Sequence, residues 1–404
     1  MDNVSIVEFD NTKFPFHLTK DDEFMEALIS TEIALARYNQ LLEQMKNLPS
    51  NLLNLFLTPL EKKEAQITSK IEGTVTSLQE LYDYDITNKD DNKGTNKEVN
   101  QYTEAIKYAQ KQIDSGHPLN EKLLREIHQE LLTSVRGKDK SPGNYKKFQN
   151  YIQNSKLGHY KPCDPVDLPI EMEKLFKIIK RVDIESQSKN PQLIDDIPGI
   201  GTLNNPEEEK IKEKNILINI AMIHAQFESI HPFDDGNGRI GRMLITLLLW
   251  KFKKIAMPNF YISSYLEDEK TKDKYFSALR GVDTKKDWKN WYLFFFKAVK
   301  SASEKNHELA VGLRDLHTKT LDDLSDLIPS TSNHDKKDKR KITLNFLFEK
   351  PNFPASEYYL GEIGSMGRKY LKRLEEKKII TEIMPAKGSA PAQYVFEAFF
   401  KLIK

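Results

Sequence analysis

Residues 231–242 read HPFDDGNGRIGR, and two apolar segments, 215–230 and 238–252, flank the HPFDDGNGR part; their composition predicts two helices. Glycines in the connecting loop let backbone N–H groups approach an anion closely, and the N-terminus of the second helix adds its dipole. Arg239 and Arg242 are three residues apart, so both side chains can reach the same side of that helix start. The stretch therefore has the composition of a phosphate-binding site.

Two further residues of this stretch suggest a reaction. Asp235 directly precedes the anion-binding loop and could hold a magnesium ion that bridges phosphates. His231 is the base in the loop whose intrinsic pKa is near neutral. A phosphate cradle, a metal ligand, a cationic clamp and a general base together are typical of enzymes that transfer a phosphate-linked group. A lone DGNG would more often be a surface turn, but the density of suitable residues here disfavours that interpretation.

At every specified position, the stretch resembles the Fic motif, HPFx(D/E)GNGRxxR. Fic-domain proteins typically transfer AMP from ATP to a Ser, Thr or Tyr hydroxyl of a target protein. The resemblance implies a mainly α fold: a Fic-type helical bundle with a short β-hairpin flap, followed by a small C-terminal winged-helix domain. It also implies ATP as the substrate and Mg²⁺ as the metal.

The same resemblance implies a role for each motif residue. His231 would deprotonate the target hydroxyl, Asp235 would hold Mg²⁺, and Phe233 would anchor the loop in the core. Arg239 would hold the β-phosphate and Arg242 the γ-phosphate. The residues expected to bind ATP are Glu72, Gly236, Asn237, Gly238, Arg239, Gly241, Arg242, Tyr275 and Phe276.

Two other segments extend the resemblance. Residues 141–152, SPGNYKKFQNYI, predict a short hairpin and resemble the flap that aligns the target's backbone. Its aligning residues would be Gly143, Tyr145 and Lys146; Lys146 stands where the family usually has Arg, which keeps the charge but loses the bidentate fork. Tyr275 and Phe276 fall where two aromatic residues often line the adenine pocket in this family, although ordinary core packing would explain them too.

The segment TSKIEGT, residues 68–74, resembles the family's inhibitory pattern (S/T)xxxE(G/N). Thr68 and Glu72 would share one face of a helix that Gly73 ends. The resemblance implies autoinhibition, in which Glu72 pairs with Arg242, occupies the γ-phosphate site and leaves ATP bound in an unproductive position. A plain helix-end carboxylate with a glycine cap is the alternative.

The composition limits the remaining possibilities. The chain has 404 residues, 30% of them charged, and a formal net charge of +1, which is typical of a globular protein with two or three domains and excludes a whole-chain polyanion binder. Its one cysteine, Cys163, excludes an internal disulfide framework and a cysteine-rich zinc cluster. No apolar run can span a membrane and no secretory signal is evident, so we expect a cytoplasmic protein.

The pattern along the chain predicts four parts. Residues 1–97 would be a helical region with the inhibitory helix at about 59–73, starting at Thr58 and Pro59, and with a polar loop at 84–97. The Fic core would follow, then a helical linker, then a winged-helix-like domain of helices and a hairpin. The bounds of these parts are 98–300 for the core, with the flap at 141–152, an insertion at 183–213 and the motif at 231–242, then 301–334 for the linker and 335–404 for the last domain.

These observations favour an autoinhibited, Mg²⁺-dependent protein adenylyltransferase. Its partner would be a target protein with a modifiable hydroxyl, with self-modification and a homodimer as further expectations. Two alternatives stay open. The basic helix at 368–378, with Arg368 and Arg373, could bind DNA in a nucleotide-sensing regulator. The same Fic site could also remove AMP from a modified protein.

Overall fold

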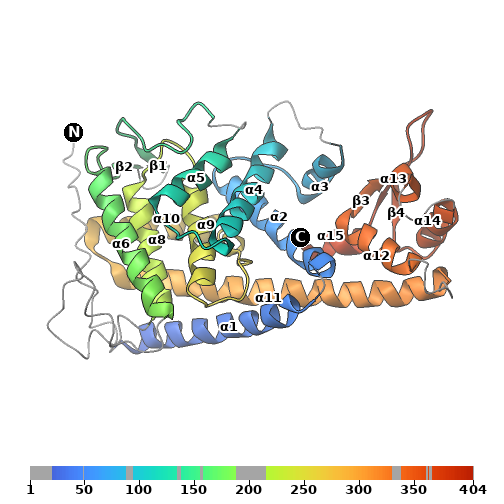
Figure 1. Ribbon diagram of the computed structural model, residues 1–404, viewed down its shortest axis with the longest axis horizontal. Coiled ribbons are helices and arrows are strands. Elements are labelled where there is room, and N and C mark those ends of the chain that lie inside the picture. The colour runs from blue at the N-terminus through green and yellow to red at the C-terminus, as the bar shows by residue number, and fades with distance from the viewer. Residues whose placement is uncertain are drawn as a thin grey trace.

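The computed structural model describes residues 21–48, 50–87, 94–133, 138–154, 158–187, 215–329, 338–360, 363 and 366–403. Helices dominate these residues, with a two-stranded hairpin and a three-stranded sheet, which confirms the mainly α prediction (Figure 1). The first elements are α1 (Asp22–Lys46), α2 (Ser50–Ile71), α3 (Leu78–Thr87), α4 (Thr95–Asp114), α5 (Glu121–Leu132), β1 (Ile152–Asn154), β2 (Gly158–Tyr160) and α6 (Leu168–Gln187). They are followed by α8 (Ile216–Ile230), α9 (Asn237–Lys251), the 3₁₀ helix η3 (Ile262–Tyr265), α10 (Glu269–Lys285) and α11 (Trp288–Leu327).

The two apolar helices that flank residues 231–236 lie at the centre of the helical region that precedes residue 328. Helix α8 has apolar residues on every face, as expected of a helix surrounded by others, and it packs against α6, α9, α10 and α11. Asn215 caps its N-terminus by accepting hydrogen bonds from two backbone N–H groups. The centre of the fold therefore holds the loop that joins α8 to α9.

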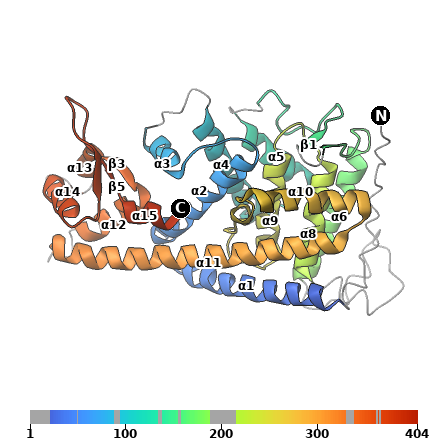
Figure 2. The ribbon, with the colours of Figure 1, turned by 180° about the vertical axis from the view of Figure 1, so that it is seen from behind.

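Helix α11 is 40 residues long and runs along the whole molecule, with α1 beside it (Figures 1 and 2). The expected boundary at residue 300, between the core and a helical linker, falls inside this single helix. Its first half buries Trp291, Phe295 and Val299, and its second half buries Leu313 and Leu324. Continuous burial along both halves explains why the helix is not interrupted.

Helix α2, the expected inhibitory helix, begins at Ser50 and not at Pro59, which lies inside it. A proline inside a helix removes one hydrogen bond, but Leu55, Phe56 and Leu57 are all buried, so packing of the preceding turns outweighs that loss. The predicted end is present. Gly73 has φ of +92°, and the bonds from Gly73 N to Lys70 O and from Thr74 N to Ser69 O, 3.0 and 2.9 Å, form a Schellman motif.

Three other expectations differ from the structure. The hairpin does not lie within 141–152 but at 152–160, where Ile152 pairs with Tyr160. Residues 84–87 of the expected loop at 84–97 belong to α3 and residues 95–97 to α4, and residues 88–93 lie outside the described residues. Residues 183–187 extend α6, and the rest of the expected insertion lies outside the described residues.

The C-terminal region forms a compact unit of its own elements. They are α12 (Lys339–Glu349), β3 (Asn352–Pro354), α13 (Ala355–Leu360), α14 (Gly367–Glu376), β4 (Thr381–Met384), β5 (Gln393–Val395) and α15 (Glu397–Ile403). The predicted hairpin is present as β4 and β5. A third strand, β3, pairs with β5 to give the sheet order β3-β5-β4, which the sequence pattern did not predict.

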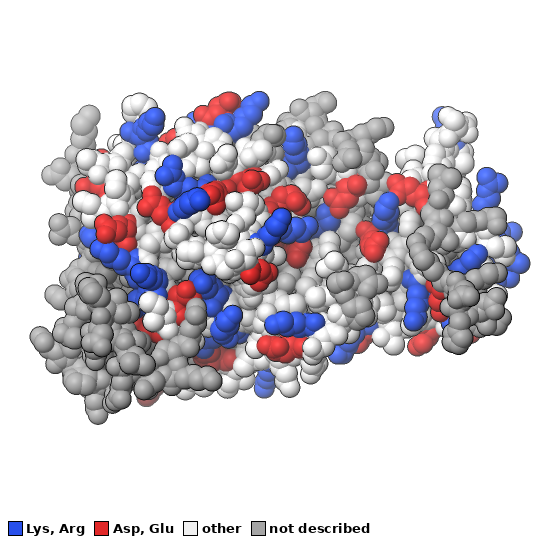
Figure 3. Space-filling view, in the orientation of Figure 1, with Lys and Arg blue, Asp and Glu red and all other residues white. Residues whose placement is uncertain are grey.

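Basic and acidic side chains are interspersed over the face shown in Figure 3, in keeping with the near-zero net charge. In the part of the chain that the structure describes, no helix is both long and apolar enough to cross a bilayer.

Candidate active site

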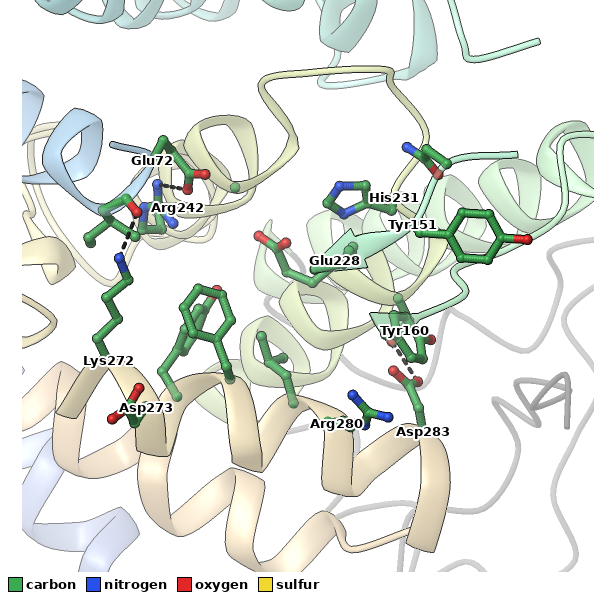
Figure 4. Close-up of a pocket in the computed structure, with 18 of the residues that line it drawn as sticks. Glu72, Tyr151, Tyr160, Glu228, His231, Arg242, Lys272, Asp273, Arg280 and Asp283 are labelled. Atoms are coloured by element: carbon green, nitrogen blue, oxygen red, sulfur yellow. Dashed lines mark hydrogen bonds and ion pairs between the residues drawn. The ribbon is translucent and has the colours of Figure 1, made fainter. Parts of the chain in front are cut away.

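A cavity of about 610 Å³ opens at the C-terminal end of α8 and the N-terminal end of α9 (Figure 4). The end of α2 contributes Glu72, α9 contributes Arg242, and α10 forms a long wall from Glu269 to Asp283. Residues around the β1–β2 hairpin, including Tyr151 and Tyr160, form the opposite rim. Segments that are far apart in the sequence thus meet around one cavity.

His231 lines this cavity at the end of α8. It adopts a left-handed conformation with φ of +49°, and its N–H donates to Phe227 O at 2.9 Å to end the helix. Burial, together with the positive charge of Lys146, lowers the pKa of His231 to about 4. The imidazole is therefore neutral at pH 7 and able to accept a proton.

The loop after His231 is held in shape by side chains. The amide group of Asn237 accepts from Phe233 N at 2.9 Å and donates to Phe233 O at 2.8 Å, so this side chain stabilises the loop instead of facing the cavity. The ring of Phe233 stacks on His128 of α5, with centroids 3.7 Å apart, as a core anchor would. His128 Nδ1 accepts from Gly143 N and its Nε2 lies 2.9 Å from Asp235 O. His128 thus joins the loop to the segment before β1.

Arg239 points away from the cavity. Its guanidinium is fully buried and lies 3.1 Å from the carboxylate of Glu98 on α4, which also accepts from Thr74 Oγ1. The carboxylate of Asp235 lies 3.5 Å from the same guanidinium. The arginine expected to hold the β-phosphate therefore has a protein carboxylate as its partner here.

The residues near Asp235 fit a magnesium ion that is bound together with a nucleotide. About a third of the Asp235 side chain is exposed, and its Oδ1 accepts from Gly236 N at the start of α9. Mg²⁺ keeps several waters and needs only one or two protein carboxylates beside substrate phosphates. Accordingly, no cluster of three metal-ligating side chains is found among the described residues, and none is required.

Arg242 is buried and has three hydrogen bonds to the end of α2. Its Nε donates to Thr68 Oγ1 at 2.7 Å, and one terminal nitrogen donates to Thr68 O at 3.1 Å and to Glu72 Oε1 at 2.7 Å. Burial disfavours the charged forms of both Glu72 and Arg242. The attraction between the two charges is stronger than this effect, so the pKa of Glu72 is lowered and that of Arg242 is raised. Two residues of the expected inhibitory pattern, Thr68 and Glu72, thus contact Arg242 directly. Figure 4 shows the pair of Glu72 and Arg242.

Two glycines of α9 lie against carboxyl groups. A Cβ atom on Gly238 would collide with Glu72 Oε1, and one on Gly241 would collide with Glu228 Oε1. The Glu72 carboxylate therefore covers the N-terminal turn of α9, where backbone N–H groups and the helix dipole attract anions. Gly241 is buried behind Glu228 and does not line the cavity.

The position of the aromatic pair on α10 agrees both with a wall of a binding pocket and with ordinary core packing. Tyr275 and Phe276 line the cavity, with ring centroids 5.2 Å apart. Tyr275 is also nearly fully buried, and its hydroxyl lies 2.9 Å from Nε2 of His224. The pair is thus part of the core and one wall of the cavity at the same time.

The residues expected to align a target lie beneath the cavity. Lys146 is buried, its N–H donates to Pro232 O at 2.9 Å, and its Nζ donates to Asn150 Oδ1 at 2.9 Å. Arg125 donates to Gly143 O at 2.7 Å and lies over the ring of Tyr145. These bonds to the loop and to α5 explain why this segment is not a strand. The residues that reach the cavity are instead Asn150, Tyr151, Ile152 and Tyr160.

The Fic/DOC family model matches residues 118–249, and the model of the Fic/DOC family N-terminal region matches residues 25–111. Together they cover more than half of the chain, including the cavity's His231, Arg242 and Glu72 helix. The chain belongs to the Fic/DOC family. Proteins of this family often AMPylate other proteins and are typically transferases.

Two solved structures are similar to this Fic protein. A Fic domain containing signaling protein from Bacteroides thetaiotaomicron is 16% identical over 71% of this chain and 97% of that chain, with a TM-score of 0.52. A Fic family protein from Desulfovibrio desulfuricans is 18% identical over 93% of this chain and 96% of that chain, with a TM-score of 0.55. Both likenesses show the shared fold.

Glu98 is a site residue of this Fic protein that the sequence did not reveal, and its importance can be tested by stability. Replacing Glu98 by Ala removes the nearer carboxylate of the buried Arg239 and leaves only the 3.5 Å contact with Asp235. Removing one partner of a buried ion pair typically costs about 3–5 kcal/mol. We expect chemical denaturation to show a loss of unfolding free energy in that range. The matched control is Glu104→Ala on the same helix, whose exposed pair with Lys107 is worth less than about 1 kcal/mol. Equal losses would show that the Glu98–Arg239 pair is dispensable.

Proposed function

We propose that this Fic protein is an autoinhibited protein adenylyltransferase that transfers AMP from ATP to a Ser, Thr or Tyr hydroxyl of a target protein. One observation carries the proposal. A neutral histidine, the N-terminus of a helix and a buried arginine border one cavity, and the arginine is engaged by Glu72. Transfer of AMP requires a base and a site that binds phosphates, and autoinhibition requires a group that occupies the phosphate site and can leave it.

In the proposed reaction, His231 accepts the proton of the target hydroxyl as its oxygen attacks the α-phosphorus of ATP. The bond between that phosphorus and the oxygen leading to the β-phosphate breaks, and pyrophosphate leaves. The N–H groups at the start of α9 hold the phosphates and stabilise the developing charge. When Mg²⁺ is bound by Asp235 and the phosphates, it neutralises phosphate charge.

Autoinhibition follows from competition for Arg242. Its guanidinium can hold a terminal phosphate through both terminal nitrogens only if Glu72 withdraws, because Glu72 already accepts from one of them. The Glu72 carboxylate also lies over the first turn of α9. A nucleotide that enters while Glu72 is docked therefore lacks the position needed for attack at its α-phosphorus.

Mass spectrometry tests the proposed function directly. The Glu72→Gly variant, wild type and the Glu72→Gly/His231→Ala double variant are incubated with ATP, Mg²⁺ and lysate of the source cells. We expect a mass increase of one AMP on at least one protein, the Fic protein itself included, with the Glu72→Gly variant and not with the double variant. If the Glu72→Gly variant binds ATP but forms no AMP adduct on any protein, the proposed reaction is wrong.

The pH dependence provides a separate check on His231. Its folded-state pKa lies below the ordinary value, so the base form is lost only as the pH falls toward about 4. We expect kcat of the Glu72→Gly variant at saturating ATP to change less than about twofold between pH 8 and pH 6, whereas a histidine of ordinary pKa would lose about three quarters of its base form. A midpoint near pH 6.5 would contradict a buried, neutral base.

The C-terminal region supports part of the other expectations. We propose that residues 338–403 form a winged-helix-like domain, because a helix, a strand, two helices and a hairpin follow in that order. On its basic helix α14, Arg373 donates to Leu327 O at 2.7 Å and Arg368 lies over the ring of Tyr359. DNA binding, a homodimer, removal of AMP and a cytoplasmic location stay predictions from the sequence.

A further inference from the structure

Glu228 is a carboxyl group in the cavity to which the proposed reaction gives no task. It lies in the last turn of α8, three residues before His231, and points into the cavity between Arg242 and His231 (Figure 4). Only 9% of the residue is exposed. Its Oε1 is buried and has no hydrogen-bond partner among the residues that the structure describes.

A buried acceptor without a partner is costly, so such groups are rare unless a ligand or water completes them. The protein nevertheless makes room for this carboxyl group, because Gly241 leaves the space that any side chain there would fill. Burial raises the pKa of Glu228 to about 7, with Arg242 opposing the shift and Glu72 adding to it. The carboxyl group is thus held in place in the wall of the cavity, with Oε1 against Gly241.

The position of Glu228 indicates which part of a nucleotide it would meet, an argument that rests on the proposed function. The phosphates belong at the start of α9 and at Arg242, and the base belongs against the aromatic wall of Tyr275 and Phe276. Glu228 lies one helical turn from His231, and therefore next to the α-phosphate site. The hydrogen-bond donors closest to an α-phosphate in a nucleotide are the hydroxyl groups of its ribose.

We infer that Glu228 binds a ribose hydroxyl of the nucleotide and makes this site selective for ribonucleotides over deoxyribonucleotides. A carboxylate is the group that other nucleotide sites use to accept a hydrogen bond from a ribose hydroxyl. The bond gives the buried carboxyl group a hydrogen-bond donor and fixes the sugar beside the reacting phosphate. Glu228 is thus a positioning and specificity-determining residue.

Binding measurements with nucleotide analogues test the inference. Titration calorimetry measures Kd for ATP, 2′-deoxy-ATP, 3′-deoxy-ATP and ITP with Mg²⁺, in the full-length Glu72→Gly/His231→Ala protein so that no transfer occurs. We expect loss of the bonded hydroxyl to weaken binding by about tenfold or more, as for a hydrogen bond to a charged group. Adding Glu228→Ala should weaken ATP binding and reduce the difference between ATP and the deoxy analogue to less than about twofold.

Two further variants keep the test interpretable. Glu228→Gln retains an acceptor oxygen and the shape of the side chain, so it should fold normally and show an intermediate preference. Glu64→Gln changes another buried glutamate, whose carboxylate is already bonded to Ser263, and should leave the hydroxyl preference unchanged. Thermal unfolding of each variant confirms that the fold is intact.

The outcomes separate the inference from the function on which it rests. If ATP binds but neither deoxy analogue binds more weakly, or if the preference persists in Glu228→Ala, the inference is wrong. If Glu228 instead makes binding of ITP weaker than binding of ATP, and the deoxy analogues bind like ATP, the carboxyl group contacts the base and the inference is wrong. If no variant binds ATP, the proposed function fails and the inference fails with it.

Discussion

Replacing His231 by Ala in the Glu72→Gly background is expected to lower the rate of AMP transfer by about 10²–10⁴-fold, the usual contribution of a general base. His231 lines the cavity beside the start of α9, and burial keeps its imidazole neutral. Without it, the target hydroxyl must lose its proton to water. The rate is measured as incorporation of labelled AMP into a target identified by mass spectrometry.

The matched control for this prediction is His117→Ala. His117 lies exposed in the turn after α4, far in sequence from the motif, and its ring contacts only Gln112 O among the bonds described for it. Its loss should leave the rate within about twofold, because exposed substitutions away from special features have small effects. A His231→Ala rate equal to that of the control would mean that another group accepts the proton.

Replacing Glu72 by Gly is expected to raise the rate of AMP transfer by about tenfold to a hundredfold, the range typical of a coupling between two sites. The substitution removes the carboxylate that holds Arg242 and covers the first turn of α9. Initial rates at low and at saturating ATP measure the effect. Glu72→Gln, which keeps a hydrogen-bond acceptor but loses the charge, should give a smaller increase.

The control for Glu72 is Glu267→Ala. Glu267 forms an exposed pair with Lys70 of α2 at 3.6 Å, and the bonds described for Arg242 go to Thr68 and Glu72 instead. Its removal should not raise the rate. If Glu72→Gly and Glu267→Ala behave alike at both ATP concentrations, Glu72 is a helix-end carboxylate and not an inhibitory residue.

The sequence predicted those features whose signals are local. The motif at 231–242, the two apolar helices around it and the glycine that ends α2 were all readable from spacing and residue type. The start of α2 was not, because Pro59 is a local signal and the burial that overrides it is a tertiary effect. The hairpin was misplaced for a similar reason, since bonds from Lys146 and Gly143 to distant segments hold residues 141–151 out of a strand.

The partners of the site residues were mostly beyond sequence reasoning. Glu98 and Arg239 are 141 residues apart, and no spacing rule links them. His128 occupies a buried position on the apolar face of α5, so a polar residue in an apolar pattern was the one available hint. Glu228 offered a similar hint within the apolar sequence of α8. Such residues become meaningful only when their surroundings are known.

The end of α2 has a consequence for how quickly inhibition can be released. Glu72 lies just beyond the last residue of the helix, Ile71, whose carbonyl accepts from Lys272 at 2.8 Å. Helix ends open locally at a small fraction of the free energy of global unfolding, on timescales of about a microsecond or less for a single turn. Withdrawal of Glu72 by such local opening, in the proposed inhibition, involves the last turn of α2, whose Ile71 is part of the hydrophobic core, while the preceding turns keep their place. Release of the proposed inhibition therefore needs local opening of the last turn and not unfolding of the whole helix.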